Sequence, residues 1–82
     1  MATASQPHCQ HELDLCGLDC PLPILRTKQA LRDMAVGERV RVHATDPHAV
    51  IDFQGFCDTT SHRLLSKTQD QAVYTFCIER GP

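Results

Sequence analysis

Apolar and polar residues alternate strictly over residues 39–45, with Val40, Val42 and Ala44 on one face. Alternation with a period of two is typical of a strand that buries one side. Similar patterns predict three further strands at residues 13–15, 62–68 and 72–79. The polar turn 69–71 separates the last two, which are therefore expected to form a hairpin.

A first helix is predicted from Pro21 to Ala35. Proline is favoured at the first helical position, which places Cys20 at the N-cap. The side chains expected on its buried face recur at helical spacing and are Ile24, Thr27, Leu31, Met34 and Ala35. Leu22 and Leu25 fall off this face, so they are either covered by loops or form an apolar rim for a partner.

A second helix is predicted from Pro47 to about Asp58, with Asp46 as its N-cap. Its expected buried face is Ala49, Val50, Phe53, Phe56 and Cys57. The resulting order is βαβαββ, which predicts a two-layer α/β (α+β) sandwich with a four-stranded mixed sheet and two helices on one face. We expect one domain over residues 12–80, preceded by a mobile tail at residues 1–11.

Length and charge limit the function of the chain. It has 82 residues and a formal net charge of −2, which argues against a general nucleic-acid binder. No run approaches the roughly 18 apolar residues that a membrane span needs. The first eleven residues contain no apolar signal-peptide core, so the expected location is the cytoplasm.

Cys20 is the leading candidate for chemistry among five cysteines. A helix N-terminus carries partial positive charge, which would favour the thiolate form of a cysteine placed there. Pro21 and Pro23 would stiffen the turn, although each removes an N–H donor. Arg26 and Lys28 would add positive potential. The alternative is that Cys20 is only a small N-cap residue.

The other four cysteines are weaker candidates for chemistry than Cys20. Cys16 either acts as a resolving thiol for Cys20 or simply ends a strand. Cys57 and Cys77 are expected to be buried and structural. A metal cluster is conceivable from residues of the tail and the turn, namely His8, Cys9, His11, Cys16 and Cys20, but their spacing does not fit a zinc site, so we expect no metal.

Histidines and arginines on the predicted strands and helices are further candidates for a site. His43, His48 and His62 are expected to be isolated surface residues. Arg39, Arg41 and Arg63 could form a basic strip on the sheet, read either as a solvated face or as a docking surface for an acidic partner.

The stretch LDLCGLDCPLP, residues 13–23, resembles the signature of the TusA family of sulfur carrier proteins, also called SirA-like. Gly37-Glu38, the following strand, Thr45-Asp46-Pro47, Asp52 and Phe56-Cys57 also fit. The resemblance implies a persulfide on Cys20, a sulfur carrier rather than a stand-alone enzyme, and no cofactor. It implies a cysteine desulfurase or rhodanese-like donor and an acceptor protein in tRNA thiolation, molybdenum-cofactor maturation or sulfur metabolism.

One departure and two alternatives remain. The family usually has Gly where Ser61 precedes His62, so Ser61 would be strained if that position needs a positive φ. A redox-responsive interaction module using Cys16 and Cys20 is the main alternative function. RNA binding is the weakest, suggested because the fold resembles the C-terminal domain of translation initiation factor three.

Overall fold

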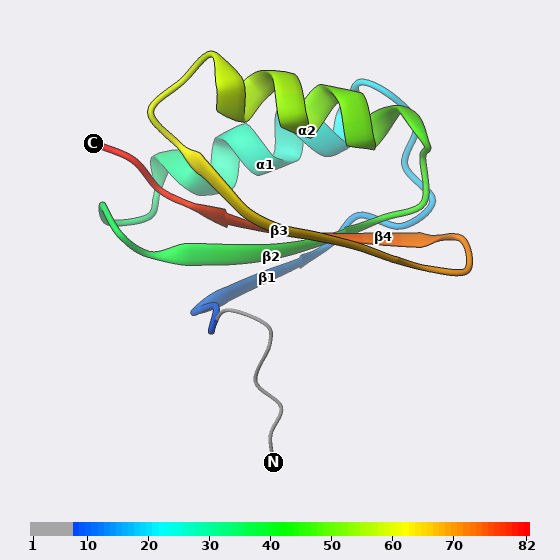
Figure 1. Cartoon of the computed structure of the whole chain (residues 1–82), viewed down its shortest axis with the longest axis horizontal. Coiled ribbons are helices and arrows are strands. Elements are labelled where there is room, and N and C mark those ends of the chain that lie inside the picture. Colours follow the sequence, from blue (N-terminus) through cyan, green and yellow to red (C-terminus); the bar gives the residue numbers. More distant parts are fainter. Residues whose placement is uncertain (1–7) are drawn as a thin grey trace.

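A computed structural model of the chain describes residues 8–82, which form four strands and two helices in the order βαβαββ (Figure 1). The elements are β1 (His11–Asp14), α1 (Leu22–Arg32), β2 (Arg39–Ala44), α2 (His48–Asp58), β3 (Arg63–Asp70) and β4 (Val73–Glu79). β1 therefore begins at the last residue of the predicted tail, and residues 1–7 of that tail lie outside the described residues. No helix in residues 8–82 is long and apolar enough to cross a membrane.

The strands form one mixed sheet in the order β1-β2-β4-β3. β1 runs parallel to β2, with Leu13 opposite Val42, while β4 is antiparallel to both β2 and β3. Both helices lie on one face of this sheet (Figure 1). The predicted two-layer sandwich is confirmed. Because β1 and β2 are parallel, their carboxyl ends lie at the same edge of the sheet.

The core lies between the helices and the sheet. Val40, Val42 and Ala44 are fully buried, as their alternation predicted. Phe76 of β4 packs against Phe53 of α2 with ring centroids 4.5 Å apart. Fully burying a side chain of this size contributes roughly 1.5–3 kcal/mol, so this layer supplies much of the stability of the chain.

The buried face of α1 agrees with the prediction except at its end. Ile24, Leu31 and Met34 are buried, and Thr27 is completely buried while its hydroxyl donates to the Pro23 carbonyl across 2.9 Å. That internal bond explains how a polar side chain is tolerated there. The prediction of Ala35 as buried is wrong, because α1 ends at Arg32 and Ala35 lies in the turn that follows.

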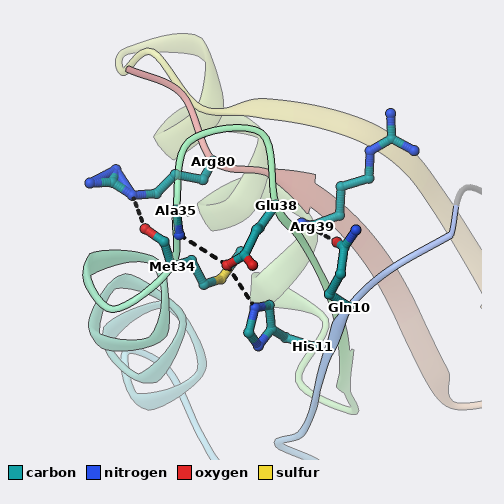
Figure 2. A network of polar contacts seen from close by, with 7 residues as sticks. All are labelled: Gln10, His11, Met34, Ala35, Glu38, Arg39 and Arg80. Atoms are coloured by element: carbon teal, nitrogen blue, oxygen red, sulfur yellow. Dashed lines mark hydrogen bonds and ion pairs between the residues drawn. The ribbon is translucent and has the colours of Figure 1, made fainter.

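A polar network fastens the amino ends of β1 and β2 (Figure 2). Glu38 Oε1 accepts a hydrogen bond from the Ala35 N–H across 2.9 Å. The same oxygen lies 3.0 Å from Nε2 of the His11 ring. These bonds lower the pKa of Glu38 below its ordinary value. Nearby, the Arg80 guanidinium donates to the Met34 carbonyl. This end of the sheet is thus closed by structural contacts, and the opposite end carries the loop with Cys20.

Ser61 is not strained. Gln71 is the one non-glycine residue with a positive φ among residues 8–82, so Ser61 has an ordinary backbone conformation. Its hydroxyl donates to the Pro82 carbonyl across 2.7 Å. A Cβ on Gly81 would lie 1.9 Å from the Ser61 carbonyl oxygen, so the close approach of the two segments requires glycine at position 81. The departure from the family pattern at Ser61 is accommodated without a left-handed turn.

Candidate functional site

Cys20 lies in the loop between β1 and α1, at the carboxyl edge of the two parallel strands. The prediction that it caps α1 is wrong. The helix begins at Leu22 with Pro21 as the N-cap residue, and the Leu22 N–H bonds to the Asp19 carbonyl at 2.8 Å. A tight turn therefore separates Cys20 from the helix, and the peptide bond between Cys20 and Pro21 is cis.

Thr45 and Asp46, which follow β2, hold this loop in place. The Gly17 N–H donates to the Thr45 hydroxyl across 2.8 Å, and the Cys20 N–H donates to Asp46 Oδ2 across 2.5 Å. Gly17 has a φ of 87°, which favours glycine. The position of Cys20 is therefore set by a contact 26 residues away in the sequence.

Asp46 also serves the second helix. Its other oxygen, Oδ1, accepts the His48 N–H across 3.0 Å, which satisfies one of the free donors at the start of α2. The prediction of Asp46 as the N-cap residue is wrong by one position, because the N-cap residue is Pro47, but the Asp46 carboxylate still binds the first N–H of the helix. One carboxylate thus couples the start of α2 to the backbone of Cys20.

Asp52 controls the protonation of Cys20. The exposed thiol donates a hydrogen bond to Asp52 Oδ2 across 3.4 Å. This bond, together with partial desolvation and the negative charges of Asp52 and Asp46, raises the pKa of Cys20 above its ordinary value. The expectation that the helix N-terminus favours the thiolate is therefore wrong: the sulfur lies ahead of the helix and faces a carboxylate.

A groove between α1 and α2 adjoins Cys20, with a volume of about 350 Å³. It is lined by Pro21, Ile24, Lys28, Ile51, Asp52, Gly55, Phe56 and Thr59. The Lys28 ammonium lies 5.4 Å from the centroid of the Phe56 ring. Ile51 is 70% exposed. Leu22 and Leu25 are also exposed, so loops do not cover them, and the alternative of an apolar rim is favoured. The surface beside the thiol thus combines apolar side chains with one cation, Lys28, and one carboxylate, Asp52.

The remaining residues predicted to support the site are divided between its surface and the core. Pro23 is buried at the start of α1, and Arg26 is exposed on the same helix. Cys16 is exposed, and its N–H bonds to Asp14 Oδ1 across 3.1 Å. Partial desolvation and a side-chain hydrogen bond to Asp14 raise the pKa of the Cys16 thiol. No disulfide joins Cys16 to Cys20.

Cys9 and Cys77 form a close pair that the sequence did not indicate, with their sulfur atoms 2.6 Å apart. Cys77 is 2% exposed, yet it points away from the core because its neighbours Phe76 and Ile78 face the helices. Burial and the hydrogen bond to Cys9 raise the pKa of Cys77 to about 12. The predictions of burial for Cys57 and Cys77 are confirmed.

The histidine and cysteine cluster considered from the sequence does not form within residues 8–82. Cys9 contacts Cys77 and His11 contacts Glu38. A different set comes together: atoms of Cys20, His48 and Asp52 that can bind a metal all lie within 4.8 Å of one another. His48 is exposed as expected, but it is not isolated.

The other histidines and the predicted basic strip also make specific contacts. His43 bonds to Glu12 across 2.6 Å and to the Thr75 hydroxyl, and His62 accepts the Gly81 N–H, so neither is isolated. In the strip, Arg39 and Arg63 both pair with Glu79, at 3.3 and 3.6 Å. The shared carboxylate offsets part of the positive charge, which favours the reading of a solvated face.

Comparisons with known proteins decide the family. Residues 11–80 match the family described as Sulfurtransferase TusA. This chain belongs to the TusA family. A sulfur carrier protein TusA of Allochromatium vinosum is 42% identical over 70 residues, covering 85% of this chain and 92% of the relative. A protein of Neisseria meningitidis serogroup A, provisionally named a sulfur carrier, is 46% identical over 67 residues, covering 82% and 90%.

The fold comparison agrees with TusA membership. The crystal structure of a SirA-like protein from Desulfitobacterium hafniense superposes with a TM-score of 0.77 at 23% identity, covering 89% of this chain and all of that one. The relatives support a sulfur carrier role for this TusA chain.

In the sequence, Asp52 stands out only as part of the family pattern, and its contact with Cys20 is not predicted. The one sequence signal for this part of the site is the four-residue spacing between His48 and Asp52.

Proposed function

We propose that Cys20 carries sulfane sulfur as a persulfide and relays it between proteins in the cytoplasm. The observation that carries the proposal is the placement of this thiol: it is exposed, held by its backbone and bordered by an apolar groove. A small chain with its reactive atom at the surface suits transfer between partners better than turnover of a free substrate.

The loading step needs no cofactor. The thiol of Cys20 first gives its proton to solvent or to a base on the donor. The thiolate then attacks the terminal sulfur of a donor persulfide, the S–S bond of the donor breaks, and the donor cysteine leaves as a thiolate. The terminal sulfur with its hydrogen is now bonded to Cys20. Delivery to an acceptor repeats this exchange in the opposite role.

Asp52 gives this relay a resting state. Because its carboxylate raises the pKa of Cys20, the unloaded thiol stays protonated at neutral pH and resists oxidation. On delivery Cys20 departs as a thiolate, so the same negative charge also holds back release until the acceptor supplies a proton or positive charge. A donor that brings positive charge toward Asp52 would lower the pKa of Cys20 on docking and start the reaction.

The donor is a cysteine desulfurase or a rhodanese-like protein, and the acceptor belongs to tRNA thiolation, molybdenum-cofactor maturation or sulfur metabolism. We propose that the groove beside Cys20 receives these partners. Its exposed Ile51 offers apolar contact, and Lys28 offers a cation. Ile51→Glu is expected to raise the KM for a donor protein, whereas Gln71→Glu, the same charge change at the tip of the β3–β4 hairpin, is expected to leave it unchanged.

Intact-mass spectrometry tests the proposal. The chain is incubated with a cysteine desulfurase and cysteine, and separately with a loaded rhodanese, in metal-free buffer. One added sulfur atom is expected on the unchanged chain and on Cys16→Ser, but none on Cys20→Ser. The proposal fails if the unchanged chain gains no more sulfur than Cys20→Ser with donors of both classes. Loss of transfer in Cys16→Ser would favour the redox module that uses both thiols.

A further inference from the structure

Three side chains of different chemistry meet at the carboxyl edge of the parallel strands. The Cys20 sulfur, a ring nitrogen of His48 and a carboxylate oxygen of Asp52 lie within 4.8 Å of one another. His48 and Asp52 are four residues apart on α2, so they occupy the same side of the helix one turn apart. Cys20 approaches them from the loop before α1.

We propose that Cys20, His48 and Asp52 bind a zinc-like divalent cation. Zinc takes thiolate, imidazole and carboxylate ligands at about 2.0–2.3 Å, so two ligands on one tetrahedral ion lie about 3.3–3.6 Å apart. A pair of atoms at the 4.8 Å limit would need to close by roughly 1.2–1.5 Å, whereas the Cys20 sulfur and Asp52 Oδ2, at 3.4 Å, already have this spacing. Cys20 and His48 are exposed and can rotate to do so. Water fills the fourth position.

The surroundings favour this cation over others. Asp46 holds both the Cys20 backbone and the start of α2, which places the third ligand against the helical pair. The thiol already donates to Asp52, and the metal takes the place of that proton. A Cys–S–metal bond forms, the S–H bond breaks, the proton leaves to solvent, and no group changes oxidation state. Mixed sulfur, nitrogen and oxygen ligands suit zinc or cobalt, whereas magnesium and calcium prefer oxygen alone.

Metal binding would also regulate the thiol. A sulfur that shares an electron pair with the cation is a weaker nucleophile than a free thiolate, so the metal-bound form should be alkylated and accept sulfur more slowly. The effect on alkylation is independent of the sulfur relay, and only the effect on sulfur loading rests on the proposed function. Free zinc would then hold the carrier in an unloaded form.

Direct titration of the reduced full chain tests the site. Zinc affinity is measured by competition with a chromogenic chelator, and cobalt is added as a spectroscopic probe. One equivalent should bind, with a thiolate-to-cobalt absorption band, and magnesium should not displace it. His48→Ala, Asp52→Asn and Cys20→Ser should each weaken zinc binding about tenfold or more. Circular dichroism establishes that each variant is folded.

Matched controls lie outside the three residues. His8→Ala and Cys16→Ser remove another exposed histidine and another exposed thiol, and both should leave zinc affinity unchanged. Zinc should also slow the alkylation of Cys20 by iodoacetamide. Absence of binding, or equal affinity in His48→Ala and the unchanged chain, would overturn the site. These measurements use no sulfur donor, and sulfur loading is measured without metal, so failure of either leaves the other standing.

Discussion

The thiol of Cys20 and the carboxylate of Asp52 are joined by a hydrogen bond of 3.4 Å that links two segments 32 residues apart. It connects the loop that presents the sulfur to the middle of α2. Because a carboxylate stabilises the protonated thiol and opposes the thiolate, this contact decides at which pH the sulfur becomes a nucleophile.

Asp52→Asn is expected to make Cys20 more reactive. The amide carries no negative charge, so the pKa of Cys20 should fall toward its ordinary value. The rate of alkylation by iodoacetamide at pH 7 to 8 should rise about two- to fivefold, and the midpoint of its pH profile should move to lower pH. Asp58→Asn, on the same helix, is the control and should leave the profile of Cys20 in place. An unchanged midpoint in Asp52→Asn would show that Asp52 does not hold the proton.

Substitutions of Asp46 should separate its two roles. Asp46→Ala removes the acceptor for the His48 N–H and should destabilise the chain by about 1 kcal/mol in urea unfolding. Asp46→Asn keeps one carbonyl oxygen, which can cap α2 but cannot also serve the Cys20 N–H. Its stability should therefore be nearly normal, while hydrogen exchange of the Cys20 amide becomes faster. Equal exchange rates of the Cys20 amide in the unchanged chain and Asp46→Asn would show that Asp46 does not hold the Cys20 N–H.

Mild oxidation is expected to link Cys9 to Cys77. Their sulfurs are 2.6 Å apart, and Cys9 is the more exposed of the two. Glutathione disulfide should first react at Cys9, and Cys77 should then displace glutathione to complete the bond. Because the pKa of Cys77 is raised to about 12, the second step should accelerate with pH. Peptide mapping without reduction identifies the pair, and Cys9→Ser should abolish it. A predominant Cys16–Cys20 product would instead support the redox module.

Stability should fall in alkaline solution partly because of Cys57. Burial raises the pKa of its thiol from 9.0 to about 11. The folded state therefore holds this proton more tightly than the unfolded state, so the stabilisation is fully present below pH 9 and is lost as pH rises through 11. The loss is roughly 2–3 kcal/mol.

Urea unfolding at several pH values measures this contribution. Cys57→Ala should lower stability at neutral pH but show a smaller further decrease between pH 9 and 11. Ile78→Val, which removes a methyl group from the core without a titrating group, should keep the pH dependence of the unchanged chain. The assignment to Cys57 is wrong if the two variants have the same slope.

The periodic parts of the fold could be predicted from the sequence because local patterns encode them. Val40, Val42 and Ala44 alternate with polar neighbours, and their burial follows from the two-residue period of a strand. The position of Cys20 relative to α1 could not be predicted in this way. The boundary depends on Asp46, which binds the Cys20 N–H from a distant segment.

The chemistry of the site was harder to predict than its location. The motif identified Cys20, but the sign of its pKa shift depends on Asp52, whose distance from the sulfur is set by how α2 packs on the sheet. His48 belongs to the same tertiary arrangement. No spacing in the sequence relates residues 20 and 48, so only the packed structure brings them together.

Because the thiols differ in burial, their labelling rates can report local opening of the folded chain. Cys16 and Cys20 are open to reagents, whereas Cys57 and Cys77 are 8% and 2% exposed. A maleimide added to native protein should label the first two directly and reach the last two only when the helix or the sheet opens. The slow labelling rates would then report the opening of α2 and of β4 separately, without any introduced dye site.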